Sequence, residues 1–242
     1  MTQAAPDAPD APDDSNPQDA RAIALAAAQQ QAEELFAEVV ARGVIRPGVS
    51  EREASDEIRR LAAELFGVER FWHKRIVRAG ANTVEPYRSN PPDRAIEADD
   101  IVFIDFGPVF ADWEADYGRT YVLGDDPRKV ALRDALAVIW EQGREHFASR
   151  PGITGAELFA YVSDCMRRAG FSPADTHVGH LVGEFPHERI SGDGLDCYIT
   201  PGSDLPMRRT DPQGNACHWI LEVHLVDASG EFGGFMEQLL DC

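Results

Sequence analysis

The sequence predicts an α+β fold in which helices flank a mainly antiparallel sheet. Two observations carry this prediction. Segments with helical spacing of apolar residues and segments with strand character are segregated along the 242 residues, which is typical of α+β proteins. The order helix, helix, sheet also occurs twice along the chain, as expected if one half of the domain were a duplicate of the other.

The chain opens with a polar segment and two helices. The first twenty residues hold four prolines, five aspartates and no aromatic residue, so we expect residues 1–19 to be a disordered acidic tail ahead of a domain of residues 20–242. Apolar residues then recur at helical spacing from Ala20 to Val44, and Gly43 stands where a helix would end. Ser50 and Glu53 have the spacing of a capping box, which predicts a second helix that ends at Gly67.

The remaining elements follow from the same patterns. Short runs with strand character are separated by glycine and proline at residues 76–77, 101–106 and 116–122. Helical spacing returns at residues 128–147 and 155–168. The last third alternates again and predicts strands at residues 217–226 and 234–240.

Charge and hydropathy narrow the class of ligand. The chain has 42 acidic and 23 basic residues and a formal net charge of −19, so neither nucleic acid nor an anionic membrane surface is expected as a partner. The longest apolar runs are far shorter than the roughly 20 residues of a membrane helix. Residues 1–20 lack the basic and apolar regions of a secretory signal, and we therefore expect a cytoplasmic protein.

Two aspartates are the first candidates for chemistry. Asp105 ends an otherwise apolar strand, and Asp116 follows eleven residues later, on the far side of a turn near residues 110–112. Two acids that face each other across strands repel unless a cation lies between them. The alternative is structural: Asp105 caps a turn and Asp116 pairs with Arg119.

Histidines and glutamates in the last third extend this set. His177, His180 and His187 lie in one glycine-rich stretch, and strict alternation in the 217–226 strand points Glu222 to the polar face. Glu237 is embedded among large apolar neighbours. Each histidine could instead be a structural hydrogen-bonding residue, and each glutamate could pair with a basic residue.

Four carboxylates and one imidazole suit a pair of divalent metal ions. Oxygen-rich ligand sets of this kind favour Mn, Fe, Co or Zn and leave the identity of the metal open. Two such ions share a bridging water, lower its pKa and stabilise the species formed when that water attacks a carbonyl group. The pattern therefore points to hydrolysis.

The order and spacing of Asp105, Asp116, His180, Glu222 and Glu237, with His187 seven residues after His180, resemble the pita-bread metallopeptidases. This family includes methionine aminopeptidase, aminopeptidase P, prolidase and creatinase. The resemblance covers residues 20–242 and implies a pseudo-twofold pita-bread fold with a curved antiparallel sheet. It also implies that Asp105 binds one ion, that Asp116 and Glu237 bridge both, and that His180 and Glu222 complete the other.

The same resemblance assigns catalysis and substrate binding. Glu222 would help to activate the bridging water, and His187 would bind substrate or carry a proton. Family peptidases usually carry a substrate-binding histidine after a proline ahead of the first aspartate, but here Tyr87 and Arg88 follow Pro86. The candidates for substrate binding are His73, Tyr87, Arg88, His177 and His187.

We therefore expect a manganese-type, dinuclear metallopeptidase that acts on a small peptide, as an aminopeptidase or dipeptidase of the Xaa-Pro type, and that could form a homodimer as many relatives do. Two alternatives stay open. One is a pita-bread module that binds a partner without cleaving it, which the missing Pro-His imidazole favours and the five intact ligands oppose. The other is a metal hydrolase that acts on a non-peptide amide. Metal content and a cleavage screen separate the three.

Overall fold

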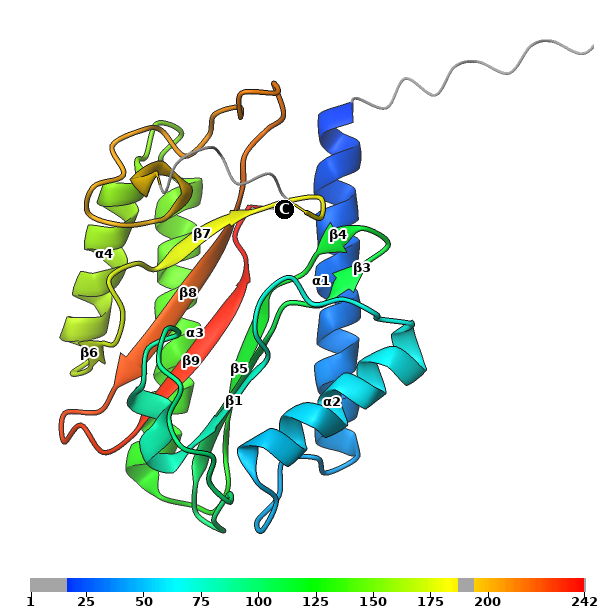
Figure 1. The fold of residues 1–242 in the computed structure, drawn as a ribbon. Coiled ribbons are helices and arrows are strands. Elements are labelled where there is room, and N and C mark those ends of the chain that lie inside the picture. Colours follow the sequence, from blue (N-terminus) through cyan, green and yellow to red (C-terminus); the bar gives the residue numbers. More distant parts are fainter. Residues whose placement is uncertain (1–16, 187–193, 242) are drawn as a thin grey trace, which may run out of the picture.

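The structure is a computed structural model that describes residues 17–186 and 194–241. Its central feature is a sheet of seven strands with the order β1-β2-β5-β9-β8-β6, in which β7 also pairs with β8 (Figure 1). Every pair in this sheet is antiparallel, which confirms the predicted α+β class. The strands are β1 (Ile76–Ala79), β2 (Ile101–Phe106), β5 (Tyr117–Val122), β6 (Ser172–Pro173), β7 (Gly179–Val182), β8 (His218–Val226) and β9 (Gly233–Leu239).

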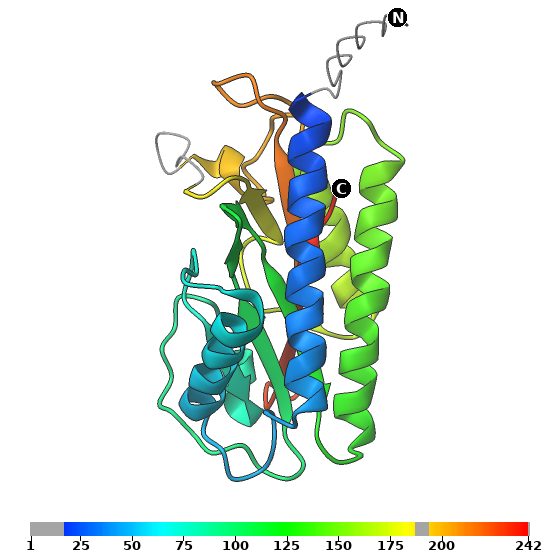
Figure 2. The ribbon, with the colours of Figure 1, turned by 90° about the vertical axis from the view of Figure 1, so that its right-hand side faces the viewer.

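Within the described residues, four α-helices flank the sheet, and two of them, α1 and α3, run along the length of the domain (Figure 2). They are α1 (Pro17–Ala41), α2 (Glu51–Phe66), α3 (Pro127–Ala148) and α4 (Gly155–Arg168), and two short 3₁₀ helices, η1 (Gly80–Val84) and η2 (Leu195–Cys197), lie in the connections. None of the described helices combines the length and the apolar composition that a bilayer crossing requires.

Local signals set several of these boundaries. The Ser50 side chain accepts a hydrogen bond from the backbone N–H of Glu53, the Glu53 side chain accepts one from the N–H of Ser50, and Gly67 ends α2 with a φ of 66°. The capping box and the glycine stop are therefore confirmed. Helix α1 begins at Pro17, inside the segment assigned to the acidic tail, because proline is well suited to the first helical turn.

Alternation along the strands separates an apolar face from a polar one. On β2, Val102, Ile104 and Phe106 share a core cluster with residues of α1 and α2. On β8, Trp219 and Leu221 share a second cluster with residues of α3 and α4. Since neighbouring residues of a strand point to opposite faces, the acids between these apolar residues point away from the helices. The candidate site therefore lies on the face of the sheet opposite these helices, where its acids are still buried.

A tight hairpin joins the two strands that carry the aspartates. Its strands are β3 (Val109–Phe110) and β4 (Trp113–Glu114), and its two central residues, Ala111 and Asp112, have φ angles of 47° and 72°. Two positive φ angles are typical of a type I′ turn, whose twist matches that of the paired strands. The turn predicted near residues 110–112 is confirmed, and it returns the chain so that β5 pairs with β2.

Candidate metal centre

Three of the four acidic residues lie in one row across neighbouring strands. Asp105 on β2 is opposite Gly118 on β5, Gly118 is opposite Glu237 on β9, and Glu237 is opposite Glu222 on β8. Asp116 directly precedes β5, two residues before Gly118, and belongs to both groups of converging ligand atoms. A Cβ atom on Gly118 would lie 2.6 Å from the Phe235 ring and 3.2 Å from the Cβ of Glu237, so only glycine fits at this place in the row. Strand register thus gathers acids that lie far apart in the sequence.

His180 on β7 brings an imidazole to these carboxylates. Its Nε2 lies 3.2 Å from Oδ2 of Asp116 and 3.6 Å from Oε1 of both Glu222 and Glu237. Its Nδ1 lies 2.8 Å from the carbonyl oxygen of Leu181. Donation from Nδ1–H to this carbonyl leaves Nε2 free to bind a cation, which is the arrangement found around metal-binding histidines.

A second imidazole, that of His73, lies on the other side of Asp116. Its Nε2 is 3.0 Å from Oδ1 of Asp116 and 3.6 Å from Oδ1 of Asp105. Its Nδ1 is 2.8 Å from the carbonyl oxygen of Lys74. The sequence assigned His73 to substrate binding, whereas the structure places it directly against two carboxylates of the predicted ligand set.

The charges and donors of this cluster fit divalent metal ions. Among the described residues, the ion pairs of these acids within 4.0 Å are with histidines and not with lysine or arginine. Asp105 Oδ1 and Glu237 Oε2 are buried and have no hydrogen-bond partner in the described part of the chain. Two groups of ligand atoms converge within 4.8 Å, and Asp116 belongs to both. Buried carboxylates of this kind need a cation, and carboxylate with imidazole is a donor set that binds transition metals.

Without an ion, the crowded acids differ in their affinity for protons. Burial raises the pKa of Asp105 to about 7, although the charge of His73 acts against it. Burial and the neighbouring carboxylates also raise the pKa of Glu237 well above its ordinary value. Burial acts to raise the pKa of Asp116 too, but the charge of His73 and hydrogen bonds from both histidines lower it. Protons therefore occupy places that a divalent ion would take, so metal binding should release protons.

We expect the metal-free protein to lose stability between pH 7 and pH 9. Burial lowers the pKa of His73, but Asp116 and Asp105 outweigh it and raise that pKa to about 9, above the ordinary 6.5. The stability that the imidazolium contributes is complete below pH 6.5 and is lost as the pH rises through 9. Urea unfolding in the presence of a chelator should show a loss of about 2 kcal/mol over this range.

The matched control for this titration is His73→Gln, which removes the titrating group. The loss of stability between pH 7 and pH 9 should be clearly smaller in this variant than in the unchanged protein. A free energy of unfolding that stays constant or rises over the same range would contradict the prediction.

His177 lies at the Glu222 end of the acid row. Its Nε2 is 3.6 Å from Oε1 of Glu222, and its Nδ1 is 3.3 Å from Oδ1 of Asp175. Burial lowers the pKa of His177, but these two acids raise it above its ordinary value. The residue can therefore supply a hydrogen bond or a proton at the edge of the site.

The other candidates for substrate binding occupy different positions. Tyr87 is 40% exposed, and its ring centroid lies 6.1 Å from that of His73. Arg88 is exposed on the same segment. His187 falls outside the described residues 17–186 and 194–241, so its catalytic and substrate-binding roles stay predictions.

The alternative pairing of Asp116 with Arg119 does not occur. Arg119 instead donates to the carbonyl oxygens of Gly118 and Glu237.

Trp72 is a residue of the site that the sequence did not predict. Its ring centroid lies 4.5 Å from that of His73 and 5.3 Å from that of His180. The signal that could have found it is its position directly before His73.

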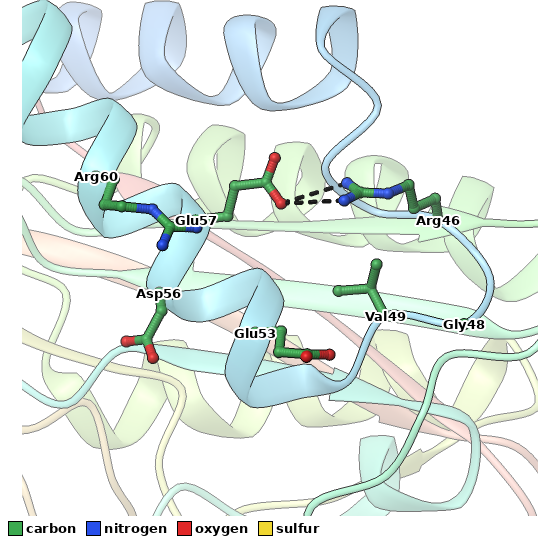
Figure 3. A pocket seen from close by; sticks show the side chains of 7 residues that line it. All are labelled: Arg46, Gly48, Val49, Glu53, Asp56, Glu57 and Arg60. Atoms are coloured by element: carbon green, nitrogen blue, oxygen red, sulfur yellow. Dashed lines mark hydrogen bonds and ion pairs between the residues drawn. The ribbon is translucent and has the colours of Figure 1, made fainter.

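The surface pocket drawn in Figure 3 is separate from this centre. It has a volume of about 460 Å³ and is lined by charged side chains of α2 and of the loop that precedes it. Arg46 reaches across it to Glu57, with atoms 3.3 Å apart. None of its residues belongs to the predicted ligand set.

Comparison with known proteins points in the same direction. Residues 24–208 match the model of metallopeptidase family M24. A curated Xaa-Pro dipeptidase of Lactobacillus helveticus is 29% identical over 188 residues, which cover 72% of this chain and 50% of that protein. The chain spans about half the length of the curated relatives it matches.

Solved structures show the same fold. A dipeptidase from Mycobacterium ulcerans has a TM-score of 0.68 and 26% identity, with 91% of this chain and 54% of that chain covered. Methionine aminopeptidase from Thermotoga maritima has a TM-score of 0.66 and 18% identity, with 89% and 92% covered. The pita-bread fold implied by the sequence is confirmed.

Proposed function

The chain belongs to metallopeptidase family M24, and on this premise we propose that it is a dinuclear metal-dependent peptidase that hydrolyses peptide bonds of the Xaa-Pro type. The observation that carries the proposal is the convergence of buried acids and an imidazole without a lysine or arginine partner among the described residues. The Xaa-Pro preference is supported by the relatives named Xaa-Pro dipeptidase.

We propose the division of ligands that the family resemblance implies. Asp105 would hold one ion, His180 and Glu222 would hold the other, and Asp116 and Glu237 would contribute to both. The central position of Asp116 supports this division, because its two oxygens face opposite imidazoles. When bound, the ions lower the pKa of a water molecule and stabilise negative charge on the carbonyl oxygen that is attacked.

Glu222 is the residue best suited to move the proton. Burial raises the pKa of its carboxyl group, although His177 and His180 act against this, and a general base works best when its pKa lies near the working pH. Glu222 takes a proton from the attacking water and delivers it to the leaving amine. His177 lies close enough to orient the Glu222 carboxylate or the substrate, and His187 remains a proposed substrate ligand.

The test is a cleavage screen after the metal has been measured. Elemental analysis of the purified protein should find close to two transition-metal ions per chain. With Mn(II) or Co(II) present, Xaa-Pro dipeptides should be cleaved faster than longer peptides, non-proline dipeptides or small amides. Metal without any peptide cleavage would favour the hydrolase of non-peptide amides, and the absence of both metal and cleavage would favour the binding module.

The identity of the metal, the oligomeric state and the cellular location are proposed from the sequence. Manganese is proposed among Mn, Co, Fe and Zn because the donor set is rich in oxygen. Assembly as a homodimer and a cytoplasmic location stay predictions. Light scattering on the purified protein tests the first of these.

A further inference from the structure

We propose that His73 is a sixth protein ligand of this centre and that its Nε2 binds the ion held by Asp105 and Asp116. The inference rests on the proposed metal centre but goes beyond its ligand set, which contains a single imidazole. It gives each half of the sheet one histidine, with His73 ahead of β1 and His180 on β7.

The distances around His73 are those of atoms that share one ion. Its Nε2 lies 3.0 Å from Oδ1 of Asp116 and 3.6 Å from Oδ1 of Asp105. Nitrogen and oxygen ligands sit about 2.0–2.2 Å from a transition metal, which places neighbouring ligand atoms roughly 3 Å apart. Asp105 Oδ1 has no hydrogen-bond partner among the described residues, so it too is free to face an ion between the three side chains.

The ring of His73 is held in the way that His180 is held. In both, Nδ1 lies 2.8 Å from the carbonyl oxygen of the following residue, and Nε2 points at carboxylates. Once the ring gives up its second proton to solvent, a hydrogen bond from Nδ1–H leaves the lone pair on Nε2. Both side chains are therefore prepared to act as ligands through the same atom.

The surroundings of His73 keep the ring in this place. Its side chain is only 7% exposed. A Cβ on Gly107 would lie 2.1 Å from its Cδ2 and 2.4 Å from its Nε2, so only glycine at that position leaves room for the ring. The ring also contacts Trp72, with centroids 4.5 Å apart. A buried, locked imidazole fits a ligand better than a side chain that must follow a substrate.

One chemical consequence is a change in which metal ions bind best beside Asp105. Imidazole suits Zn, Co and Fe better than Mg or Ca. The ion beside Asp105 should therefore bind more tightly to this chain when it is a transition metal than a purely carboxylate site would allow. The segment with Tyr87 and Arg88 then has no histidine to offer substrate, and the imidazole on this side of the site serves the metal.

The experiment counts coordinated histidines directly. The metal-free full chain is titrated with Co²⁺, and proton NMR records the exchangeable imidazole N–H signals that a paramagnetic ion shifts far downfield. We expect two bound ions and a shifted N–H signal for each of His73 and His180. His73→Ala and His73→Gln should each lose one of these signals, and one of the two dissociation constants should rise about tenfold or more.

The control is His146→Ala, which removes a histidine that stacks on Tyr161 in α3 and α4, away from the cluster. It should keep both signals and both dissociation constants. Glutamine at position 73 keeps most of the side-chain volume. Thermal unfolding of both the His73→Gln and the His73→Ala variants checks that each is folded.

The outcomes separate the inference from the proposed function. If wild-type protein binds two ions and both His73 variants keep both signals and both affinities, His73 only hydrogen-bonds Asp116 and the inference is overturned. If wild-type protein binds one ion and His73→Ala gains a second, the imidazolium itself fills that position, which also overturns it. If wild-type protein binds no Co²⁺, the metal centre fails, and the proposed function fails with it.

Discussion

Glu237→Ala is expected to abolish peptide hydrolysis and to reduce metal content to less than one ion per chain. Glu237 faces Glu222 across β8 and β9, is buried, and has an unpartnered oxygen in the described part of the chain. Loss of a bridging carboxylate removes a ligand from both ions at once. Because bound metal supplies several kcal/mol of transition-state stabilisation, we expect kcat/KM to fall about a thousandfold or more. Asp116→Ala should behave in the same way.

The control for this prediction is Glu231→Ala. Glu231 is an exposed acid just ahead of the same strand and pairs with Arg128, so its loss should leave activity and metal content unchanged. Full activity in both Glu237→Ala and Asp116→Ala would refute the metal centre.

The Glu237 carboxylate that activity requires should lower the stability of the metal-free protein. Burial and like charges raise the pKa of Glu237, so its ionised form is unfavourable in the metal-free fold. Glu237→Gln should therefore raise the free energy of unfolding of the metal-free protein at neutral pH while it removes activity. Urea unfolding with a chelator present measures this change, and a purely structural role for Glu237 would give the reverse sign.

Of the substitutions proposed, Gly179→Ala is expected to lower the free energy of unfolding the most. Gly179 has a φ of 145°, and a Cβ there would lie 2.1 Å from the backbone oxygen of Ile220 on β8. The clash acts against a backbone atom that cannot move without breaking the pairing of β7 with β8. We expect a loss of about 3 kcal/mol or more, together with weaker metal binding because His180 is the next residue.

Gly170→Ala provides the matched control. Gly170 also has a positive φ, 89°, but a Cβ there would meet nothing within 4 Å. This variant should cost only the conformational penalty of about 1–2 kcal/mol and should keep its metal. Denaturant unfolding and Co²⁺ titration of the two variants separate the strain of a positive φ from the clash with the Ile220 backbone. Equal losses of unfolding free energy in the two variants would contradict this account of Gly179.

Much of the fold can be predicted from the sequence because helix and strand boundaries depend on neighbouring residues. The range of β2 matches its predicted residues 101–106, and that of α4 matches 155–168, since apolar spacing and caps act within a few residues. Alternation in the 217–226 strand puts Trp219 and Leu221 on the apolar face opposite Glu222, and in the structure both pack against α3 and α4. The strands β3, β4 and β6 are only two residues long and leave no period to detect.

Alternation alone could not say what each polar residue on that face does. It put His224 on the same face as Glu222, but the structure gives His224 Nε2 a backbone partner, the carbonyl oxygen of Thr83, 2.8 Å away. The two readings of Asp116 were equally open in the sequence. Only the folded chain gives Arg119 to the carbonyl oxygen of Glu237 and leaves Asp116 to the histidines.

The sequence by itself determined the helices, the main strands, the order of the acids and the family they resemble, because each of these depends on neighbouring residues or on spacing along the chain. The tertiary structure decided which side chains meet. Gly118 pairs with Glu237, and His73 reaches Asp116, through sheet register and loop packing between distant segments. Such contacts are set by the whole core at once, so no local pattern can encode them.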